Sequence, residues 1–216
     1  MTPLVIVGAG GHGRELLDIV DALAAVGDTT YEFAGFVDDG EIDAEIVGRR
    51  GAQMLGTTDV LADFDAHYAL GVGKSAIRAE LDTKLTSFGR RAATLVHPLA
   101  SVASDNVLAP GVVLAAGSRV TTNVHLGRHT HLNVNAVVSH DCRVGDHVTL
   151  SPGVFLNGEV TVADGAFFGT SAVVTPGLTV GQGAIVGAGA VVTGNVAPST
   201  TVVGVPARPV WTPKQP

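Results

Sequence analysis

Hydrophobic residues recur at every sixth position through the C-terminal half of the chain. Counted from His97, sixteen successive hexads end in Val, Leu or Phe, and the last of them ends at Val192. The fourth position of each hexad is usually small or β-branched, as at Ala136 and Cys142. A period of six fits neither an amphipathic helix, with a period of 3.6, nor a hairpin sheet, with a period of two. The pattern predicts a coil of short strands and turns, with one aliphatic residue pointing inward from each hexad.

The N-terminal half has a different pattern, in which short apolar runs alternate with helical periodicity. Strands are predicted at residues 4–7 (LVIV), 32–37 (EFAGFV), 68–73 (YALGVG) and 92–96 (AATLV), and helices after the glycine-rich turn 8–13 and over 74–89. This alternation predicts a small parallel α/β domain with Rossmann-like order over residues 1–96. We assign residues 97–216 to the coil, closed at its end by a cap from VPARPVWTPKQP.

Charge supports a boundary near residue 96. Residues 1–96 hold eight Lys and Arg against fifteen Asp and Glu, whereas residues 97–216 hold five of each. The net charge of −7 argues against nucleic acid and anionic membranes as partners. No apolar run approaches the roughly 18 residues of a membrane span, and the N-terminus lacks the basic start of a signal peptide. The lone Cys142 indicates a reducing, cytoplasmic setting.

The glycine-rich turn predicts a nucleotide site. Gly8, Gly10 and Gly13 match the G-x-G-x-x-G fingerprint, and Asp38 and Asp39 end the second strand where an acidic ribose partner is expected. About 95 residues hold only half of a dinucleotide-binding domain. We therefore favour a mononucleotide, with a phosphate at the helix N-terminus and a carboxylate accepting from base or ribose. NAD, and a tight turn with no ligand, remain the alternatives.

Several segments together indicate a family. GAGGHGRE, FVDD, LGVGKSAIR, HPLASV, SHDCRVGD and VVGVPARPV resemble the sialic-acid, bacillosamine-type (PglD-like) and perosamine acetyltransferases, which carry a nucleotide-sugar domain ahead of a left-handed parallel β-helix. The resemblance implies an acetyl-CoA-dependent N-acetyltransferase acting on a UDP-, dTDP- or GDP-linked 4-amino-4,6-dideoxy sugar, such as GDP-perosamine. It further implies a role in surface polysaccharide (O-antigen) biosynthesis, no metal, and a homotrimer with active sites between neighbouring subunits.

The resemblance also assigns binding residues. It implies that the nucleotide sugar contacts Gly10, Gly11, His12, Gly13, Asp38, Asp39, Gly71 and Lys74. It implies that acetyl-CoA contacts Asn133, Gly158, Gly187 and Ala188.

His140 is the candidate general base. It occupies the second position of its hexad, beside a corner, and is therefore free to face a cleft. An amine that attacks a thioester must lose a proton, which an imidazole can accept near neutral pH. Asp141 can accept from the other ring nitrogen. Because three hexads make one turn, Gly158 stacks above His140, and its N–H is the candidate oxyanion donor.

Many relatives carry a second histidine where this chain has Thr149, one coil above His131. The Thr149 hydroxyl replaces that contact, or the enzyme does without it, and we leave His147 out of the catalytic set. His125, His129, His131 and His147 also allow a zinc site of the carbonic anhydrase type. A sugar O-acetyltransferase and a trimeric scaffold without turnover are two further competing hypotheses. Metal analysis would test the zinc site, and a thermal shift with nucleotide diphosphates would separate a mononucleotide site from NAD or no ligand.

Overall fold

The N-terminal domain is a five-stranded parallel sheet flanked by helices. The computed structural model describes residues 1–210. The elements are β1 (Thr2–Val7), α1 (Gly11–Ala25), β2 (Tyr31–Val37), α2 (Ala44–Gly48), β3 (Met54–Gly56), the 3₁₀ helix η1 (Thr58–Ala62), β4 (His67–Leu70), α3 (Ser75–Ser87) and β5 (Arg91–Ala92). The sheet order is β3-β2-β1-β4-β5, so β1 lies at the centre. Within residues 1–210, no helix has the length and apolar character needed to cross a membrane.

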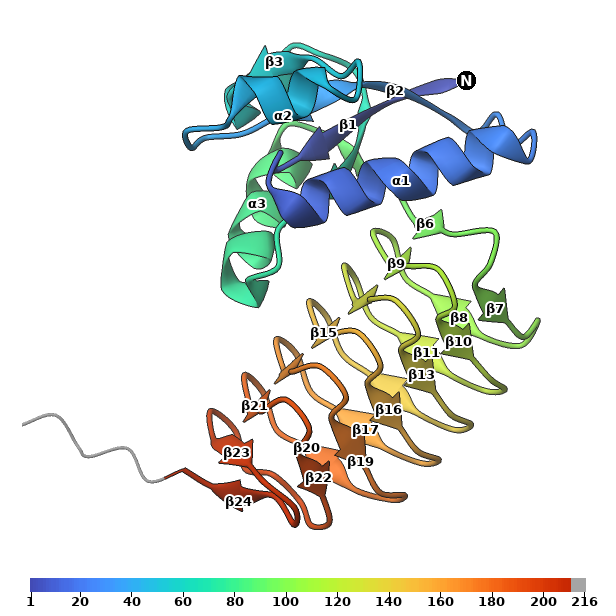
Figure 1. Cartoon of the computed structure of the whole chain (residues 1–216), viewed down its shortest axis with the longest axis vertical. Coiled ribbons are helices and arrows are strands. Elements are labelled where there is room, and N and C mark those ends of the chain that lie inside the picture. Colours follow the sequence, from blue (N-terminus) through green and yellow to red (C-terminus); the bar gives the residue numbers. More distant parts are fainter. Residues whose placement is uncertain (211–216) are drawn as a thin grey trace, which may run out of the picture.

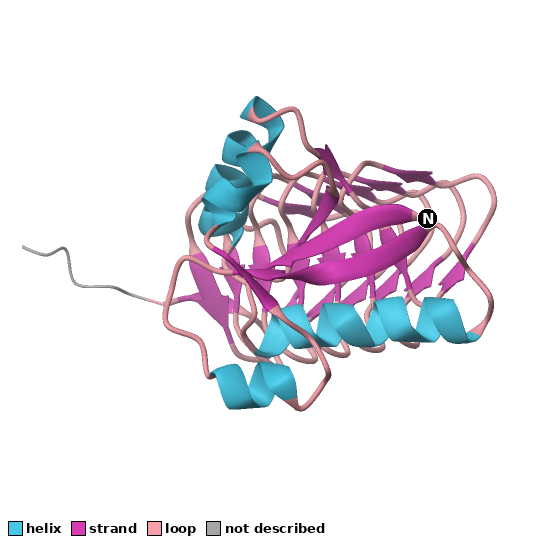
Figure 2. Ribbon diagram, turned by 90° about the horizontal axis from the view of Figure 1, so that it is seen from above, coloured by secondary structure: helices cyan, strands magenta, loops and turns pink. Residues whose placement is uncertain are grey.

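Both faces of this sheet are covered, which explains why β1 is apolar along its length. Leu4 and Ile6 pack against α1 and α2, whereas Val5 and Val7 pack on the opposite face, in a cluster with residues of η1 and α3. A parallel strand buried on both faces is expected to read as a continuous apolar run rather than an alternation. Figure 2 shows α1 and α3 on opposite sides of the central strands.

Several details differ from the sequence prediction: α2 and η1 were not predicted, and the strand predicted over 68–73 is β4, which ends at Leu70. The third strand in chain order, β3, was not predicted, because its three residues are too few to show alternation. The run 92–96, predicted as one strand, is divided between two sheets. Ala92 ends β5 beside β4, whereas Leu95 and Val96 form β6, which pairs with Val113 and Leu114 of the coil. The helix predicted over 74–89 is α3, with Lys74 as its N-cap residue.

The coil consists of two-residue strands at positions five and six of each hexad. They are β6 (Leu95–Val96), β7 (Ser101–Val102), β8 (Val107–Leu108), β9 (Val113–Leu114), β10 (Arg119–Val120), β11 (His125–Leu126), β12 (His131–Leu132), β13 (Val137–Val138), β14 (Arg143–Val144), β15 (Thr149–Leu150), β16 (Phe155–Leu156), β17 (Thr161–Val162), β18 (Phe167–Phe168), β19 (Val173–Val174), β20 (Thr179–Val180), β21 (Ile185–Val186) and β22 (Val191–Val192). After them, β23 (Thr201–Val203) pairs in parallel with β21, and β24 (Arg208–Pro209) pairs antiparallel with β23. The other expected cap residues, 211–216, lie outside the described residues.

These strands form three parallel sheets, one per side of the triangular coil. We call them sheet I (β7 to β22), sheet II (β8 to β20) and sheet III (β6 to β24). Strands pair at an offset of 18 residues, as His125 does with Arg143. Positions four and six are buried along the coil and form one continuous core. The hexad prediction of inward residues is therefore confirmed.

The corners of the coil depend on the third hexad position. Every third-position residue from Gly111 to Gly189 has a positive φ. Glycine adopts this conformation freely, but several corners carry a larger residue, including His129, Asp141, His147 and Glu159. These corners project polar side chains outward at fixed places on the coil. Asp141 is therefore itself a corner residue, directly after His140.

The α/β domain docks on one side of the coil. α1 contacts β6, and α3 lies against the corner between sheets II and III, which carries His129 and His147. Figure 1 shows the domain above the first turns of the coil, with α1 facing β6 and β9. In a three-sided coil, the corner between sheets I and II lies opposite sheet III. His140 is on that far corner, between β13 and β14.

Candidate active site

His140 and Asp141 form an exposed pair at the corner between sheets I and II. The His140 Nδ1 atom lies 2.7 Å from the Asp141 Oδ2 atom. The side chains are 53% and 45% exposed, so the outer face of the imidazole is open to a ligand. A carboxylate accepts only, so this contact places a proton on Nδ1 and leaves Nε2 as the basic atom when the ring is neutral.

Asn123, one coil below, fixes the Asp141 carboxylate. Asn123 Nδ2 donates to Asp141 Oδ1 at 2.6 Å, and Arg143 Nη1 donates to the Asn123 carbonyl at 2.7 Å. The hydrogen bonds from His140 and Asn123 lower the pKa of Asp141 below its usual value. The carboxylate therefore stays ionised. It is oriented by Asn123, which Arg143 holds in turn, and sequence reasoning identified neither residue.

Gly158 lies directly against the imidazole, as the 18-residue offset predicted. A Cβ atom at this position would lie 2.4 Å from both Cε1 and Nε2 of His140. None of the hydrogen bonds within residues 1–210 uses the Gly158 N–H. The structure thus has an unpaired backbone donor beside the basic nitrogen of His140.

The glycine-rich turn permits close approach of two loops. A Cβ atom on Gly13 would lie 1.8 Å from the Gly8 carbonyl oxygen, and one on Gly71 would lie 2.4 Å from the Gly13 Cα atom. These glycines bring the β1–α1 turn against the β4–α3 loop. In contrast, a Cβ atom on Gly10 or Gly11 would meet nothing within 4 Å, because these residues face open space at the start of α1. Helix N-termini with open space in front are suited to anionic groups.

The two predicted acidic residues have different surroundings. Asp38 accepts from the N–H groups of Ala9 and Gly40, each at 2.8 Å, and so joins the glycine-rich turn to the end of β2. Both oxygens of Asp39 instead accept from Thr58. Although burial raises the pKa of Asp39, the Thr58 hydrogen bonds bring it below its usual value. Asp38 is therefore the carboxylate nearer the turn, and Asp39 anchors η1.

A cavity of about 290 Å³ lies between α1 and the coil. It brings together His12, predicted to bind substrate, and Asn133, predicted to bind acetyl-CoA; its other lining residues include Glu15, Ile19, His97 and Val113. The Asn133 side chain donates to the Leu150 carbonyl at 3.0 Å, which fixes its direction. Gly187 and Ala188 lie three coils further along the same corner, between sheets III and I.

Within one chain, the predicted catalytic and binding residues do not converge. His140, Asp141 and Gly158 lie on the corner between sheets I and II, whereas Asn133, Gly187 and Ala188 lie on the corner between sheets III and I. The glycine-rich turn sits against sheet III, and Lys74 is exposed at the start of α3. An active site that uses all of these residues requires a second copy of the chain.

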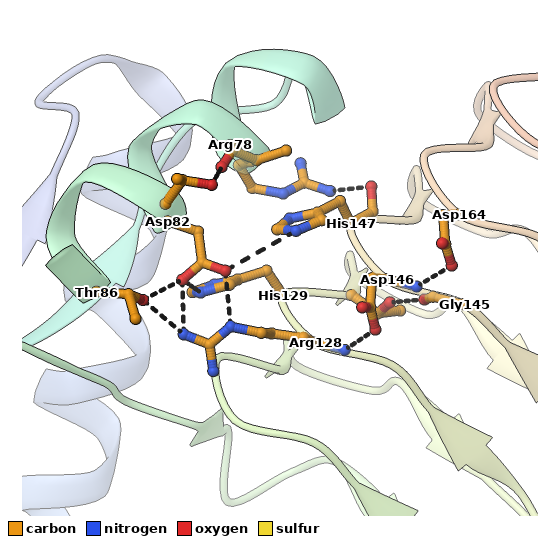
Figure 3. Close-up of polar contacts among 12 residues, drawn as sticks. Arg78, Asp82, Thr86, Arg128, His129, Gly145, Asp146, His147 and Asp164 are labelled. Carbon is orange, nitrogen blue, oxygen red and sulfur yellow. Dashed lines mark hydrogen bonds and ion pairs between the residues drawn. The ribbon is translucent and has the colours of Figure 1, made fainter.

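The joint between α3 and the coil is a polar network that sequence reasoning missed. Asp82 on α3 accepts from Nε and Nη2 of Arg128, each at 2.6 Å, and contacts His129 Nε2 at 2.9 Å and the Tyr68 hydroxyl. Although burial raises the pKa of Asp82, hydrogen bonds from His129, Arg128 and Tyr68 hold it far below its usual value. Figure 3 shows Asp82 between Arg128, His129 and His147.

Arg78, also on α3, is fully buried and has no carboxylate partner among residues 1–210. Its guanidinium donates to the carbonyls of Val72, Gly73, His147 and Val148. Burial lowers its pKa to about 10. Arg78 therefore places a positive charge among the histidines of the joint and ties α3 to the coil through backbone oxygens.

Two of the four histidines considered for zinc, His129 and His147, take part in this joint, whereas His131 contacts His12. The rings of His129 and His147 stack with an interplanar angle of 12°. Among residues 1–210, no group of three or more His, Cys, Asp or Glu side chains has an arrangement that could hold a metal ion. Thr149, at the place of the relatives' second histidine, is buried with its hydroxyl 3.4 Å from the Gly73 carbonyl oxygen.

A Rossmann-like domain docked on a left-handed β-helix, with a His–Asp pair at a coil corner, defines an acyltransferase of the hexapeptide-repeat class. The chain belongs to the PglD-like acetyltransferases of this class. Residues 3–85 match the PglD N-terminal domain. The acetyltransferase domain of PglB from Neisseria gonorrhoeae FA1090, solved with acetyl coenzyme A, is 30% identical with a TM-score of 0.86, over 97% of this chain and 99% of that chain. These matches confirm the predicted fold.

Two relatives are associated with GDP-perosamine, one as a bound ligand and the other in its name. PerB from Caulobacter crescentus, solved with CoA and GDP-perosamine, is 31% identical with a TM-score of 0.86 and 98% coverage of both chains. The GDP-perosamine N-acetyltransferase of Escherichia coli O157:H7 is 32% identical over 148 residues, which is 67% of this chain and 65% of that relative. The chain thus spans just under two thirds of this curated relative.

Proposed function

We propose that this protein transfers the acetyl group of acetyl-CoA to the amino group of a nucleotide-linked 4-amino-4,6-dideoxy sugar. The observation that carries this proposal is the His140–Asp141 pair with the unpaired Gly158 N–H beside its imidazole. The names of the relatives make a GDP-linked sugar the first candidate, with UDP- and dTDP-linked sugars as alternatives. Acetyl transfer to a sugar hydroxyl is the closest competing reaction.

The arrangement around His140 supports base catalysis. The sugar amine attacks the thioester carbon, and Nε2 of His140 takes the proton that the amine loses. Asp141 stabilises the resulting imidazolium through Nδ1, and the Gly158 N–H donates to the carbonyl oxygen as it becomes negative. Collapse of the tetrahedral intermediate breaks the carbon–sulfur bond. The leaving thiolate takes the proton from His140, which yields the amide and free CoA.

We assign nucleotide binding to residues 1–96 and acetyl transfer to residues 97–216. The phosphates are placed at the open N-terminus of α1, beside Gly10, Gly11, His12 and Gly13, with Gly71 and Lys74 on the adjoining loop. Asp38 is the proposed partner of base or ribose, because its carboxylate is bonded to Ala9 of the glycine-rich turn, whereas the Asp39 carboxylate is bonded to Thr58 at the start of η1. The single cysteine, Cys142, supports a cytoplasmic setting.

We further propose that the active protein is a homotrimer. The cavity between α1 and the coil contains His12 and Asn133 but not His140, which lies on the opposite corner. In a cyclic trimer, the His140 corner of one subunit can face the cavity of its neighbour. Acetyl-CoA then lies between two coils, against Asn133, Gly187 and Ala188 of one and Gly158 of the other.

The reaction is tested by thiol release from acetyl-CoA with a panel of GDP-, UDP- and dTDP-linked 4-amino-4,6-dideoxy sugars. We expect turnover on one of them, and a fall in kcat of about 10²–10⁴ in His140→Asn, which keeps a polar side chain but no base. Activity that survives this substitution would exclude His140 as the base. If turnover occurs only with nucleotide sugars that carry a hydroxyl group in place of the amine, the reaction is O-acetylation rather than N-acetylation.

A further inference from the structure

The two domains meet through a pair of histidines. His12, at the start of α1, lies with Nε2 3.0 Å from Nδ1 of His131 on β12. The other ring nitrogen of His12, Nδ1, lies 3.1 Å from Glu15 Oε2. His131 is 1% exposed, and His12 lines the cavity between α1 and the coil. The His12 side chain, which lines the cavity, is thus held by the buried His131 side chain.

The hydrogen-bonding partners fix where the protons lie. The Glu15 carboxylate only accepts, so His12 donates from Nδ1. If His12 is neutral, its Nε2 atom carries a lone pair and accepts from the Nδ1–H group of His131. His131 is then left with a bare Nε2 atom. That atom is buried and has no partner among residues 1–210, which is better tolerated for a lone pair than for an N–H group.

The surroundings favour the neutral form of both rings. Burial lowers the pKa of His12, and the nearby Arg78 charge lowers it further, although Glu15 acts in the opposite direction. Burial and the Arg78 charge also hold the pKa of His131 well below its usual value. Both rings are therefore uncharged near neutral pH, and the tautomers deduced from the partners apply.

We propose that His131 is a positioning residue that sets His12 in its Nδ1–H tautomer, so that His12 presents a donor to an oxygen of the bound nucleotide sugar. Glu15, with a side chain 68% exposed, holds this proton in the free protein and is free to swing away. The ligand oxygen is a phosphate or hydroxyl oxygen, since either accepts from N–H. The identity of the ligand rests on the proposed function, but the tautomer does not.

The direct test is the imidazole ¹⁵N spectrum of the full-length protein, with His12 assigned from the His12→Leu variant. We expect His12 in the Nδ1–H form. In His131→Leu, which removes the donor, we expect a larger share of the more common Nε2–H form, because only the exposed Glu15 carboxylate then favours Nδ1–H. In His131→Asn, whose amide can donate from about the position of Nδ1, we expect the Nδ1–H form to persist. An Nε2–H tautomer in the unmodified protein, or no change in His131→Leu, would overturn the proposal.

Kinetics then test the consequence. We expect His131→Leu to raise KM for the nucleotide sugar about tenfold, the effect of losing one well-placed hydrogen bond, with KM for acetyl-CoA and kcat within about twofold. His131→Asn should restore much of the loss. Because His131 acts through His12, the double variant with His12→Leu should be no worse than His12→Leu alone. Additive losses would mean that His131 only supports the fold.

The proposed function and the role of His131 can be disproved independently of each other. If no sugar in the panel is acetylated, the proposed function is wrong, but the ¹⁵N spectrum still decides the tautomer. If the sugar is acetylated and the spectrum shows the Nε2–H form, the reaction stands and the role of His131 is withdrawn.

Discussion

A methyl group at position 158 would enter the space that the His140 ring occupies. Its Cβ atom would lie 2.4 Å from Cε1 and Nε2, closer than carbon and nitrogen atoms approach, so the ring must move. We expect Gly158→Ala to lower kcat by about 10²–10³, because both the ring and the N–H donor are displaced from the reacting atoms. The φ of Gly158 is not positive, so the backbone tolerates alanine.

The matched control is Gly194→Ala near the end of the coil. Its Cβ atom would meet nothing within 4 Å, and its φ is also not positive. Steady-state kinetics and thermal unfolding of both variants separate the two effects. Equal activity in the two variants would show that the contact between Gly158 and His140 is not needed for catalysis.

At the residue scale, part of this site was open to sequence reasoning. The hexad period places Gly158 beside His140, and the structure confirms that contact. The same arithmetic places Asn123 one coil below Asp141, but an asparagine in a repeat rich in small polar residues gave no reason to single it out. The contact of His12 with His131 joins residues 119 apart, through a docking geometry that no repeat encodes.

At the scale of elements, the strands of the coil and the two long helices of the first domain, α1 and α3, were predicted from the sequence, whereas α2 and η1 were not. The sequence did not reveal how α3 meets the coil. Asp82 and Arg78 read as ordinary polar residues of an exposed helix, whereas the structure buries both against the corner formed by His129 and His147. Such side chains are buried because the other domain supplies their partners.

Asp82 therefore controls the stability of this joint. We expect Asp82→Asn to lower the free energy of unfolding by about 2–4 kcal/mol at neutral pH, because Arg128 and His129 lose a charged acceptor in a mostly buried place. Glu80→Gln, on the exposed side of the same helix, is the matched control, with an expected change within about 0.5 kcal/mol. Urea unfolding gives both values.

The same carboxylate predicts a dependence on pH. Since the folded state lowers the pKa of Asp82, its stabilisation is fully present above the unfolded value near 4 and declines as the pH falls through the folded value. The unmodified protein should then lose more unfolding free energy than Asp82→Asn between about pH 5 and pH 2. Parallel losses in the two proteins would show that the Asp82 network contributes nothing to acid stability.

At the scale of the whole molecule, the separation of the predicted sites makes a test of assembly possible. The base lies on the corner between sheets I and II, and Asn133 lines the cavity beneath α1. If each active site combines His140 of one subunit with Asn133 of the next, His140→Asn and Asn133→Leu should be inactive separately but complement each other. Every mixed trimer then contains one intact site, so a preparation of mixed trimers alone should show about a third of full activity. Co-expression of the two variants with different tags, followed by thiol-release assays on the doubly purified protein, measures this value. A mixed assembly without activity would contradict an active site shared between subunits, because His140 and Asn133 lie on different corners of the same coil.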